Sequence, residues 1–328
     1  MIPAQSLSEG GRLLRQAERP LLITHVAPDG DAVGSLLGLG WMLQALDKRP
    51  LLACQDPVPP RYRYLPGWEQ VVQQVPHERF DLRVVLDSSD TERLGTVAQA
   101  DWLADIPLLN IDHHVTNLRF GTLNLVDEAA ASTTQILYDL AGYLPAPLDE
   151  PTAVCLLTGL VTDTRGFRTA NVTPEALEVA VALMRAGASL AAITRNGLDR
   201  RSLPHLRLWG AGLTRVQASD GLVWTAISLA EQQQIGYDAR GDFGLANLLI
   251  GVEGALMAAV FTEREGGQVE VALRAAPGFD VSGLALALGG GGHPLAAGCT
   301  LPGSLKAVKR RVLTAMRQSL DRQRERAR

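Results

Sequence analysis

The sequence predicts an α/β protein of two domains, in which a doubly wound parallel sheet comes first and a smaller α/β domain with a mixed sheet follows. Short, continuous runs of Val, Leu and Ile in the first half suit strands that are buried on both faces of a parallel sheet. Stretches with apolar residues at helical spacing separate these runs, and such alternation is typical of a doubly wound domain. The length of 328 residues predicts the second domain, because single cores stop growing near ~250–300 residues.

The expected strands of the first domain each end in Asp or His. They are PLLITHVA (20–27) before Pro28-Asp29-Gly30-Asp31, FDLRVVL (80–86) before Asp87, and IPLLNI (106–111) before Asp112-His113-His114. Helices are expected over 32–46, 132–141, about 151–161 before Asp163, and from Pro174, with Thr173 as N-cap. Because ligands bind at the carboxyl ends of the strands in such sheets, these Asp and His side chains should gather at one edge.

The second half of the chain has a different pattern. Strands are expected over 221–227, near Val260 and over 269–274, with a glycine-containing turn between the last two. A glycine run precedes His293, and the Lys- and Arg-rich stretch after Ser304 indicates a helix with a solvated basic face. The predicted organisation is a catalytic domain over 1–194, a linker over 195–212 and a second domain over 213–328.

Composition excludes several classes of protein. The net charge of −4 argues against a protein held to long duplex nucleic acid by a broad basic surface. The cysteines, Cys54, Cys155 and Cys299, are too far apart for a disulfide scaffold or a thiolate zinc site. The first residues do not resemble a signal peptide, and no stretch is apolar over the ~20 residues that a membrane span needs. We therefore expect a cytoplasmic protein without a membrane partner.

The acidic and imidazole side chains predict a centre of two divalent metal ions. Crowded carboxylates repel one another unless cations lie among them. A lone Asp after a strand is more often a helix N-cap, but here four strand or helix ends finish in Asp or His. Oxygen and imidazole ligands favour Mn²⁺, leave Fe²⁺, Co²⁺ and Zn²⁺ open and disfavour Mg²⁺. Two ions ~3.5–4 Å apart serve phosphoryl transfer. The candidate ligands are His25, Asp29, Asp31, Asp87, His113 and Asp163.

Several stretches resemble the motifs of the DHH phosphoesterases. They are THVAPDGDAVGS (24–35), VVLDSSD around Asp87, NIDHHVTN around Asp112-His113-His114, and LVTDTRGFRTAN around Asp163. GGGGHPLAAG (289–298), which follows the strand ending VALRA with Arg274, resembles the signature of the DHHA1 domain. The chain is therefore identified as a member of the DHH/DHHA1 family. It is most similar to the nanoRNase/pAp phosphatase group, which includes stand-alone cyclic-dinucleotide phosphodiesterases.

The resemblance implies roles for individual residues. Two Mn²⁺ ions are implied, one held by His25, Asp29 and Asp87 and the other by Asp31, Asp87, His113 and Asp163, with Asp87 bridging. His114 would contact the scissile phosphate, which makes His114 and Asp87 the implied catalytic residues, and Asp112 would support the histidines. The implied substrate-binding residues are His114, Arg168, Arg274, Gly290, Gly291, Gly292 and His293. The N–H groups of the glycine run can form an anion-binding nest.

The implied function is Mn²⁺-dependent hydrolysis of short oligoribonucleotides, linear dinucleotides such as pApA, or pAp, with cyclic di-AMP left open. In this expectation two metal ions activate the attacking water, and the substrate lies in a cleft between the two domains. The alternatives are a manganese-dependent inorganic pyrophosphatase, which the run from Gly289 to His293 argues against, and a non-catalytic nucleotide sensor. A longer single-strand exonuclease would need a further oligonucleotide-binding domain. Relatives are commonly dimeric, so a homodimer is compatible with the resemblance.

Overall fold

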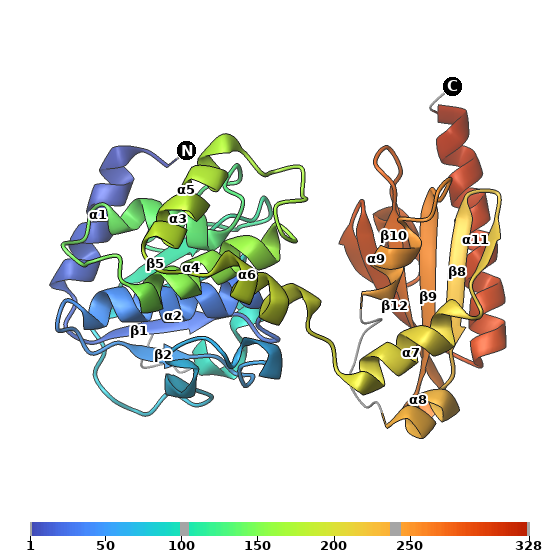
Figure 1. Ribbon diagram of the computed structural model, residues 1–328, viewed down its shortest axis with the longest axis horizontal. Coiled ribbons are helices and arrows are strands. Elements are labelled where there is room, and N and C mark those ends of the chain that lie inside the picture. The colour runs from blue at the N-terminus through green and yellow to red at the C-terminus, as the bar shows by residue number, and fades with distance from the viewer. Residues whose placement is uncertain (1, 99–104, 237–243, 327–328) are drawn as a thin grey trace. The chain divides into compact units, whose positions relative to one another are not determined.

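The computed structural model describes residues 2–98, 105–236 and 244–326. The chain divides into two units, Met1–Arg200 and Arg201–Arg328, and each has its own sheet and its own core (Figure 1). The first sheet is parallel and the second is mixed, so the structure confirms the predicted α/β fold class.

The N-terminal unit contains a six-stranded sheet in which every neighbouring pair is parallel. Its strand order is β3-β2-β1-β4-β5-β6, so the direction in which strands are added reverses between β1 and β4. Open α/β sheets bind ligands at such a switch point, outside the carboxyl ends of the strands. The strands are β1 (Pro20–Thr24), β2 (Leu51–Ala53), β3 (Val71–Val72), β4 (Leu82–Leu86), β5 (Leu108–Asp112) and β6 (Leu123–Val126).

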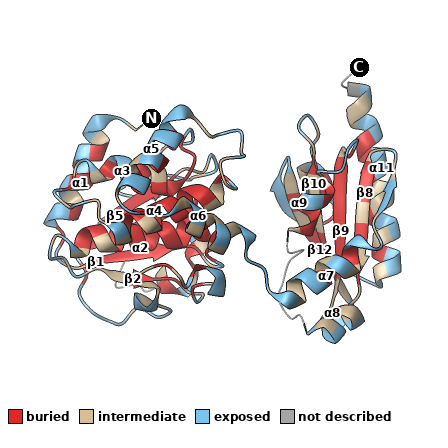
Figure 2. Ribbon diagram, in the orientation of Figure 1, coloured by how far each residue is buried: buried red, intermediate tan, exposed pale blue. Residues whose placement is uncertain are grey.

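The α-helices of this unit share one core on one face of the sheet. Leu22, Val84 and Leu109 project from three neighbouring strands into this core. The helix α2 is buried along most of its length because it packs against both β1 and α4 (Figure 2). The helices are α1 (Ala4–Gln16), α2 (Gly30–Gln44), α3 (Thr133–Ala141), α4 (Glu150–Asp163), α5 (Pro174–Arg185) and α6 (Leu190–Ile193). Thr173 caps α5 as predicted, because its side chain accepts a hydrogen bond from the Ala176 N–H.

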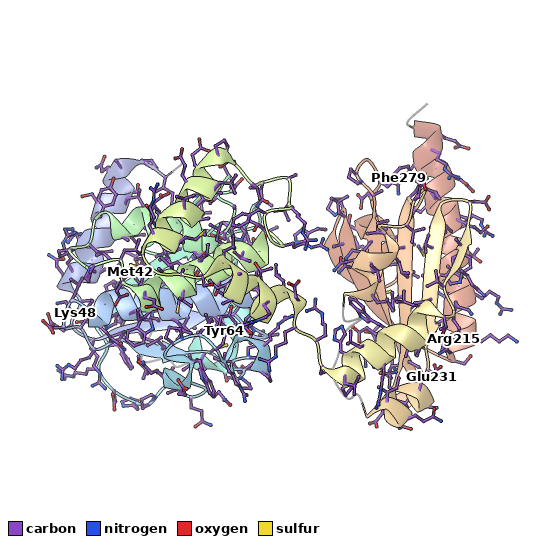
Figure 3. The ribbon with its side chains drawn as sticks, viewed as in Figure 1. Met42, Lys48, Tyr64, Arg215, Glu231 and Phe279 are labelled. Carbon is purple, nitrogen blue, oxygen red and sulfur yellow. The ribbon has the colours of Figure 1, made fainter. Side chains whose placement is uncertain are left out.

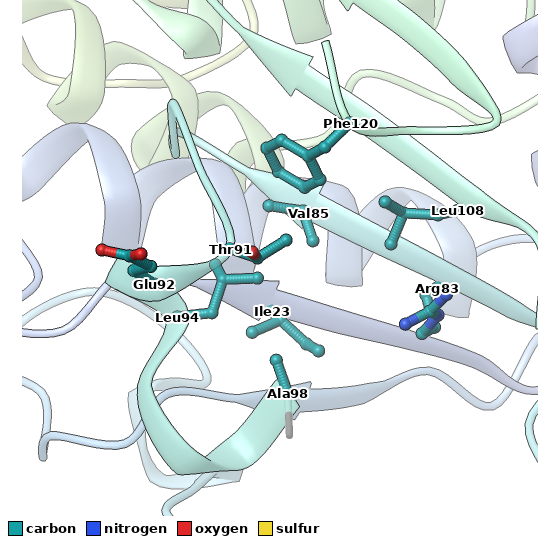
Figure 4. Close-up of a pocket in the computed structure, with 9 residues that line it drawn as sticks. All are labelled: Ile23, Arg83, Val85, Thr91, Glu92, Leu94, Ala98, Leu108 and Phe120. Carbon is teal, nitrogen blue, oxygen red and sulfur yellow. The ribbon is translucent and has the colours of Figure 1, made fainter. Parts of the chain in front are cut away.

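The opposite face of the sheet carries a smaller apolar cluster. Within the described residues, this cluster contains the short helix η3 (Glu92–Ala98) and none of the α-helices. A pocket of about 250 Å³ lies on this face, lined by Ile23, Val85 and Leu108 of the sheet and by Leu94 of η3 (Figure 4). None of the candidate metal ligands lines it, so it is separate from the predicted centre. Two further short helices of the unit are η1 (Pro60–Tyr62) and η2 (Trp68–Gln70).

The C-terminal unit contains a second six-stranded sheet, in the order β11-β12-β10-β9-β8-β7. Only β8 and β9 pair in parallel, and the other neighbours are antiparallel. The strands are β7 (Gln217–Ser219), β8 (Leu222–Ile227), β9 (Met257–Arg264), β10 (Gln268–Ala275), β11 (Gly291–His293) and β12 (Ala296–Pro302). The helices are α7 (Leu203–Leu213), α8 (Leu229–Ile235), α9 (Leu245–Leu249), η6 (Glu265–Gly267), α10 (Ser282–Ala287) and α11 (Leu305–Arg326).

Helices cover both faces of this second sheet. Leu273 and Trp224 belong to the cluster that includes α11, whereas Ala272 and Val223 belong to the cluster that includes α7 and α9. Because side chains alternate along a strand, Arg274 of β10 projects to the α9 face, where its Nε donates to Asn247 Oδ1 at 2.7 Å. The two faces of the sheet therefore pack against different helices.

The segment before the second sheet is more regular than the expected linker. The chain continues from α6 into a π-helix, Thr194–Asp199, and α7 begins at Leu203. Among the described residues, no single helix is both long enough and apolar enough to cross a membrane. In the same described part of the chain, one pair of helices, Pro174–Arg185 and Leu190–Asp199, meets the length and composition criteria together, and the pair is bent by 105°.

Candidate metal centre

The candidate ligands come from the ends of neighbouring elements at one edge of the N-terminal sheet. Among the residues that the structure describes, there are three groups of candidate ligands, and within each group the ligand atoms lie within 4.8 Å of one another. The groups are His25, Asp29 and Asp87; Asp31, His113 and Asp163; and Asp87, His113 and His114. They follow β1, β4 and β5 or lie at the start of α2 and the end of α4, as the strand-end argument predicted.

The imidazoles of His25, which is buried, and His113, which is partly buried, share one orientation. His25 Nδ1 lies 2.8 Å from the carbonyl oxygen of Val26, and His113 Nδ1 lies 3.3 Å from that of Ala130. A carbonyl only accepts, so each Nδ1 carries the proton and each Nε2 presents a lone pair. His25 Nε2 lies 3.6 Å from Asp87 Oδ2, and His113 Nε2 lies within 3.9 Å of three carboxylates. Metal-binding histidines have this arrangement, with one nitrogen held by a backbone carbonyl and the other free for the ion.

From the sequence, Asp29 could be either a helix N-cap or a metal ligand. In the structure it caps a helix and also lies among the candidate ligands. One of its oxygens, Oδ1, accepts hydrogen bonds from the N–H groups of Asp31 and Ala32 at 3.0 and 3.1 Å, and so caps α2. The side chain also belongs to the group with His25 and Asp87. The cap therefore holds the carboxylate in place beside the other candidate ligands.

Asp87 is shared between two of the three groups. It directly follows β4 and is 1% exposed. Its φ of +59° is a left-handed conformation, which Asp tolerates better than most residues that have a side chain. Thr133 Oγ1 donates to Asp87 Oδ1 at 3.0 Å. This position between two imidazoles, His25 and His113, suits a carboxylate that bridges two ions.

Asp31 is held by the beginning of α3. Its Oδ2 accepts from the Thr133 N–H at 2.6 Å and its Oδ1 from the Thr134 N–H at 3.1 Å. The carboxylate is 1% exposed and lies against Gly159 of α4, where a Cβ would be only 2.5 Å from Asp31 Oδ1. A side chain at position 159 would therefore displace this candidate ligand.

The electrostatics of the cluster fit divalent cations. Burial and the nearby charges of other carboxylates raise the pKa of Asp31 well above its ordinary value. Burial chiefly raises the pKa of Asp163 to about 6. Burial alone would raise the pKa of Asp87, but its interactions with His25, His113 and His114 lower it to about 2. Positive charge placed among Asp31, Asp87 and Asp163 would favour the ionised form of all three, and their oxygens with two imidazole nitrogens form a donor set suited to Mn²⁺.

His114 differs from the other two histidines because its Nδ1 faces a carboxylate. Asp112 Oδ1 lies 2.7 Å from His114 Nδ1 and also accepts from the His113 N–H at 2.9 Å. The hydrogen bond to Asp112 is the main cause that raises the pKa of His114 to about 9. Asn117 Nδ2 donates to Asp112 Oδ2 at 2.6 Å and holds this acid in place.

Thr133 and Asn117 also contact the cluster, although the sequence does not single out either residue as functional. Thr133 was included only in an expected helix, where the Ser132-Thr133-Thr134 run is a signal for an N-cap. Asn117 belongs to the stretch NIDHHVTN, but its amide carries no local sign that it supports an acid five residues earlier. Both residues act on the cluster through hydrogen bonds that only the folded chain brings together.

The predicted substrate-binding residues other than His114 belong to none of these three groups. Arg168 is exposed in the N-terminal unit, and its Nε donates to the carbonyl oxygen of Arg165 at 2.7 Å. Arg274 lies on β10 of the C-terminal unit. The glycine run does not form an open loop throughout, because Gly291, Gly292 and His293 form β11, an exposed edge strand paired with β12. Gly290 precedes this strand, and a Cβ there would lie 2.1 Å from the carbonyl oxygen of Gly298.

Comparison with known proteins identifies the family. The DHH family N-terminal domain matches residues 20–160, and the DHHA1 domain matches residues 228–321. The protein named bifunctional oligoribonuclease and PAP phosphatase NrnA from Thermus thermophilus is 39% identical over 316 residues, which cover 94% of this chain and 93% of that protein. The chain belongs to the DHH/DHHA1 phosphoesterase family. The family predicted from the motifs is thereby confirmed, and this DHH/DHHA1 protein is a phosphoester hydrolase.

Solved structures agree on the fold. An exopolyphosphatase-related protein from Bacteroides fragilis superposes with a TM-score of 0.89 at 21% identity, covering 98% of this chain and 97% of that chain. The exonuclease RecJ bound to manganese matches with a TM-score of 0.50 at 17% identity, covering 96% of each chain. At these identities the likeness shows that this DHH/DHHA1 chain shares their fold.

Proposed function

We propose that this protein is a Mn²⁺-dependent phosphoesterase that hydrolyses short oligoribonucleotides, linear dinucleotides such as pApA, and pAp. The observation that carries the proposal is the convergence of three His/Asp groups, with Asp87 shared, at the switch point of the N-terminal sheet. The substrate class is supported by the 39% identity to the bifunctional oligoribonuclease and PAP phosphatase from Thermus thermophilus. A cytoplasmic location is part of the proposal and agrees with three free, buried cysteines.

Two ions would be held by two sets of ligands that share Asp87. His25, Asp29 and Asp87 would hold one, and Asp31, Asp87, His113 and Asp163 would hold the other. When bound, such a pair supplies Lewis acidity at a phosphate and an activated water for in-line displacement. The backbone carbonyls of Val26 and Ala130 keep the two imidazoles in the ligating tautomer.

His114 would act directly on the substrate. Its hydrogen bond to Asp112, at 2.7 Å, raises the pKa of His114 and favours the protonated imidazole, which can donate. A charged hydrogen-bond donor next to the ions would stabilise the negative charge that develops on the phosphate oxygens. Asp112, which Asn117 holds, would orient the ring and remain an acceptor throughout.

The C-terminal unit would bind the part of the substrate that does not react. His293 lies on the exposed edge strand β11, and the N–H groups of alternate residues in this antiparallel strand point away from β12. An unpaired strand edge offers backbone donors, and the absence of side chains at the glycines lets a phosphate or ribose approach closely. Arg274 and Arg168 are the further residues proposed to contact substrate.

A substrate panel tests the proposal. The protein is stripped with chelator, reloaded with Mn²⁺ and supplied with pAp, pApA, oligoribonucleotides of two to five residues, cyclic di-AMP and pyrophosphate. We expect phosphate release from pAp and mononucleotide release from the short oligonucleotides, both dependent on Mn²⁺. Hydrolysis of pyrophosphate alone would identify a pyrophosphatase, and metal binding without turnover of any substrate would identify a sensor; either result contradicts the proposal.

A further inference from the structure

A groove of about 660 Å³ runs along the N-terminal half of α11 in the C-terminal unit. Its lining includes Trp224 of β8 together with Lys306, Lys309, Arg310, Leu313 and Arg317 of α11. The helix residues recur at intervals of three and four positions, which places them in one stripe along the helix. The stripe from Lys306 to Arg317 is about 16 Å long, which is enough for a few nucleotides.

This groove is distinct from the candidate substrate-binding residues of the same unit. Trp224 projects to the α11 face of the sheet, whereas Arg274 projects to the α9 face and bonds to Asn247. The groove also lies at the β8 side of the sheet, and the strand with His293, β11, forms the opposite edge. A ligand in the groove would therefore not compete with a ligand at Arg274 or β11.

The charge of the groove is of one sign. Lys306, Lys309, Arg310 and Arg317 are cationic, and no Asp or Glu contributes to the lining. Within the described ranges, none of the four makes an ion pair. The whole chain has a net charge of −4, so the positive charge of the groove is a local feature of an otherwise acidic protein. Such a patch attracts a polyanion.

Trp224 gives the groove a flat aromatic component. Its indole Nε1 donates to Gln217 Oε1 on β7 at 2.9 Å, which orients the ring. The side chain is partly buried, packs against the core with Leu313, and still lines the groove. A polyanion with planar groups matches this combination better than an acidic peptide does, because nucleobases stack on aromatic rings while their phosphates contact Lys and Arg.

We propose that the groove binds single-stranded RNA, with a base stacked on Trp224 and phosphates along the α11 stripe. The inference rests on the proposed function only in the choice of RNA as the ligand. It gives the C-terminal unit a second contact with oligonucleotides that extend beyond the few residues held for hydrolysis. The basic face of α11, which the sequence analysis interpreted as solvated, is in this proposal a binding surface.

Fluorescence anisotropy with a labelled oligoadenylate of about 20 nucleotides, in EDTA to prevent turnover, tests the proposal. Neutralising two cations of the groove, Arg310→Gln with Arg317→Gln, should weaken binding at least ~10-fold and lower the slope of log K against log salt by about 1.4. Trp224→Leu should weaken binding about 10-fold and leave the slope unchanged. Circular dichroism and thermal unfolding establish that each variant is folded.

The matched control neutralises two exposed arginines of the same helix outside the groove, Arg311→Gln with Arg322→Gln. This control should bind RNA like the wild type, and all variants should hydrolyse pAp in Mn²⁺ at the wild-type rate. Equal losses in the control and the groove variants would overturn the proposal. So would a polyglutamate peptide that binds as tightly as RNA and is insensitive to Trp224→Leu, because that result assigns the groove to an acidic protein. Failure of the wild type to hydrolyse pAp would contradict the proposed function and leave the binding result standing.

Discussion

The two units differ in how far their candidate functional residues are exposed to solvent. Asp31, Asp87 and Asp112 of the N-terminal unit are at most 1% exposed and are each held by hydrogen bonds from other elements. In the C-terminal unit, the strand with His293 is exposed along its whole length. Chemistry at a phosphate needs charges fixed in place and shielded from water, whereas recognition of varied ligands needs accessible donors. The comparison suggests that substitutions in the first unit should affect turnover and those in the second should affect binding.

The backbone shows the same contrast. Asp87 adopts a left-handed conformation although it has a side chain, which costs of order 1–2 kcal/mol that the surrounding fold must offset. The β11 region of the C-terminal unit uses Gly289 and Gly292, with φ of +81° and +140°, where no side chain is required. At position 87 the left-handed residue carries a candidate ligand, whereas at positions 289 and 292 it carries no side chain.

The largest effect should come from Asp87→Asn. Asn also tolerates a left-handed backbone, so the substitution removes the charge without adding strain. We expect kcat on pAp to fall by at least ~10³-fold, with less Mn²⁺ retained after gel filtration, because two candidate ion sites lose a ligand. Asp47→Asn is the matched control, since Asp47 also has φ of +59° but is exposed and outside the cluster. Undiminished turnover in D87N would break the contrast between the units.

The next effect should come from Thr133→Val, which removes the hydroxyl that donates to Asp87. We expect Mn²⁺ affinity to fall about 10- to 100-fold, because a ligand loses the group that orients it. Titration calorimetry with Mn²⁺ measures the affinity, and saturating Mn²⁺ should restore most of kcat. Thr133→Ser keeps the hydroxyl and should behave like the wild type; if it loses affinity as Val does, packing rather than the hydrogen bond is responsible.

His293→Ala tests the other side of the comparison. We expect KM for pApA to rise about 10-fold while kcat changes much less, because this residue is proposed to bind the part of the substrate that does not react. His77→Ala, at another exposed histidine, should leave both constants unchanged. A fall in kcat without a change in KM would show that His293 acts in turnover. That result would contradict the proposal that the first unit carries catalysis and the second unit carries binding.

The smallest effect concerns stability, at the capping box of α8 (Figure 3). Glu231 accepts from the Ser228 N–H at 2.9 Å and pairs with Arg215. Burial opposes its ionisation, but the interactions with Arg215 and Ser228 lower its pKa to about 2. The ionised form therefore stabilises the fold fully above its ordinary value of 4.5, and that contribution is lost as the pH falls toward about 2.

Glu231→Gln should lower the free energy of unfolding by no more than about 1 kcal/mol at neutral pH, since the pair is partly exposed and solvent screens it. The difference from the wild type should shrink between pH 4.5 and pH 2, as measured by urea unfolding at each pH. A difference that stays constant over this range would show that the loss does not come from the charge of Glu231.

Much of the candidate site could be predicted because its signals are local. Apolar runs predicted β1, β4 and β5, and the Asp and His residues that end them stand where parallel strands bring their carboxyl ends together. The short strands β2, β3 and β6 were not predicted, since two to four residues carry too little pattern. The helix α1 was also missed. The most apolar long stretch of the sequence, 245–261, which Asn247 and Glu253 interrupt, divides into α9 and the beginning of β9.

The sequence by itself determined the fold class, the family and the set of candidate ligands, because each depends on patterns within short stretches of the chain. Only the tertiary structure decided the tautomers of His25 and His113, the hold of Thr133 on Asp31 and Asp87, and the groove between Trp224 and α11. Those features join residues that are far apart in the chain, such as Asp31 and Thr133, 102 positions apart. Burial and packing in the folded protein bring these distant residues together, and the local sequence pattern does not predict which of them will be in contact.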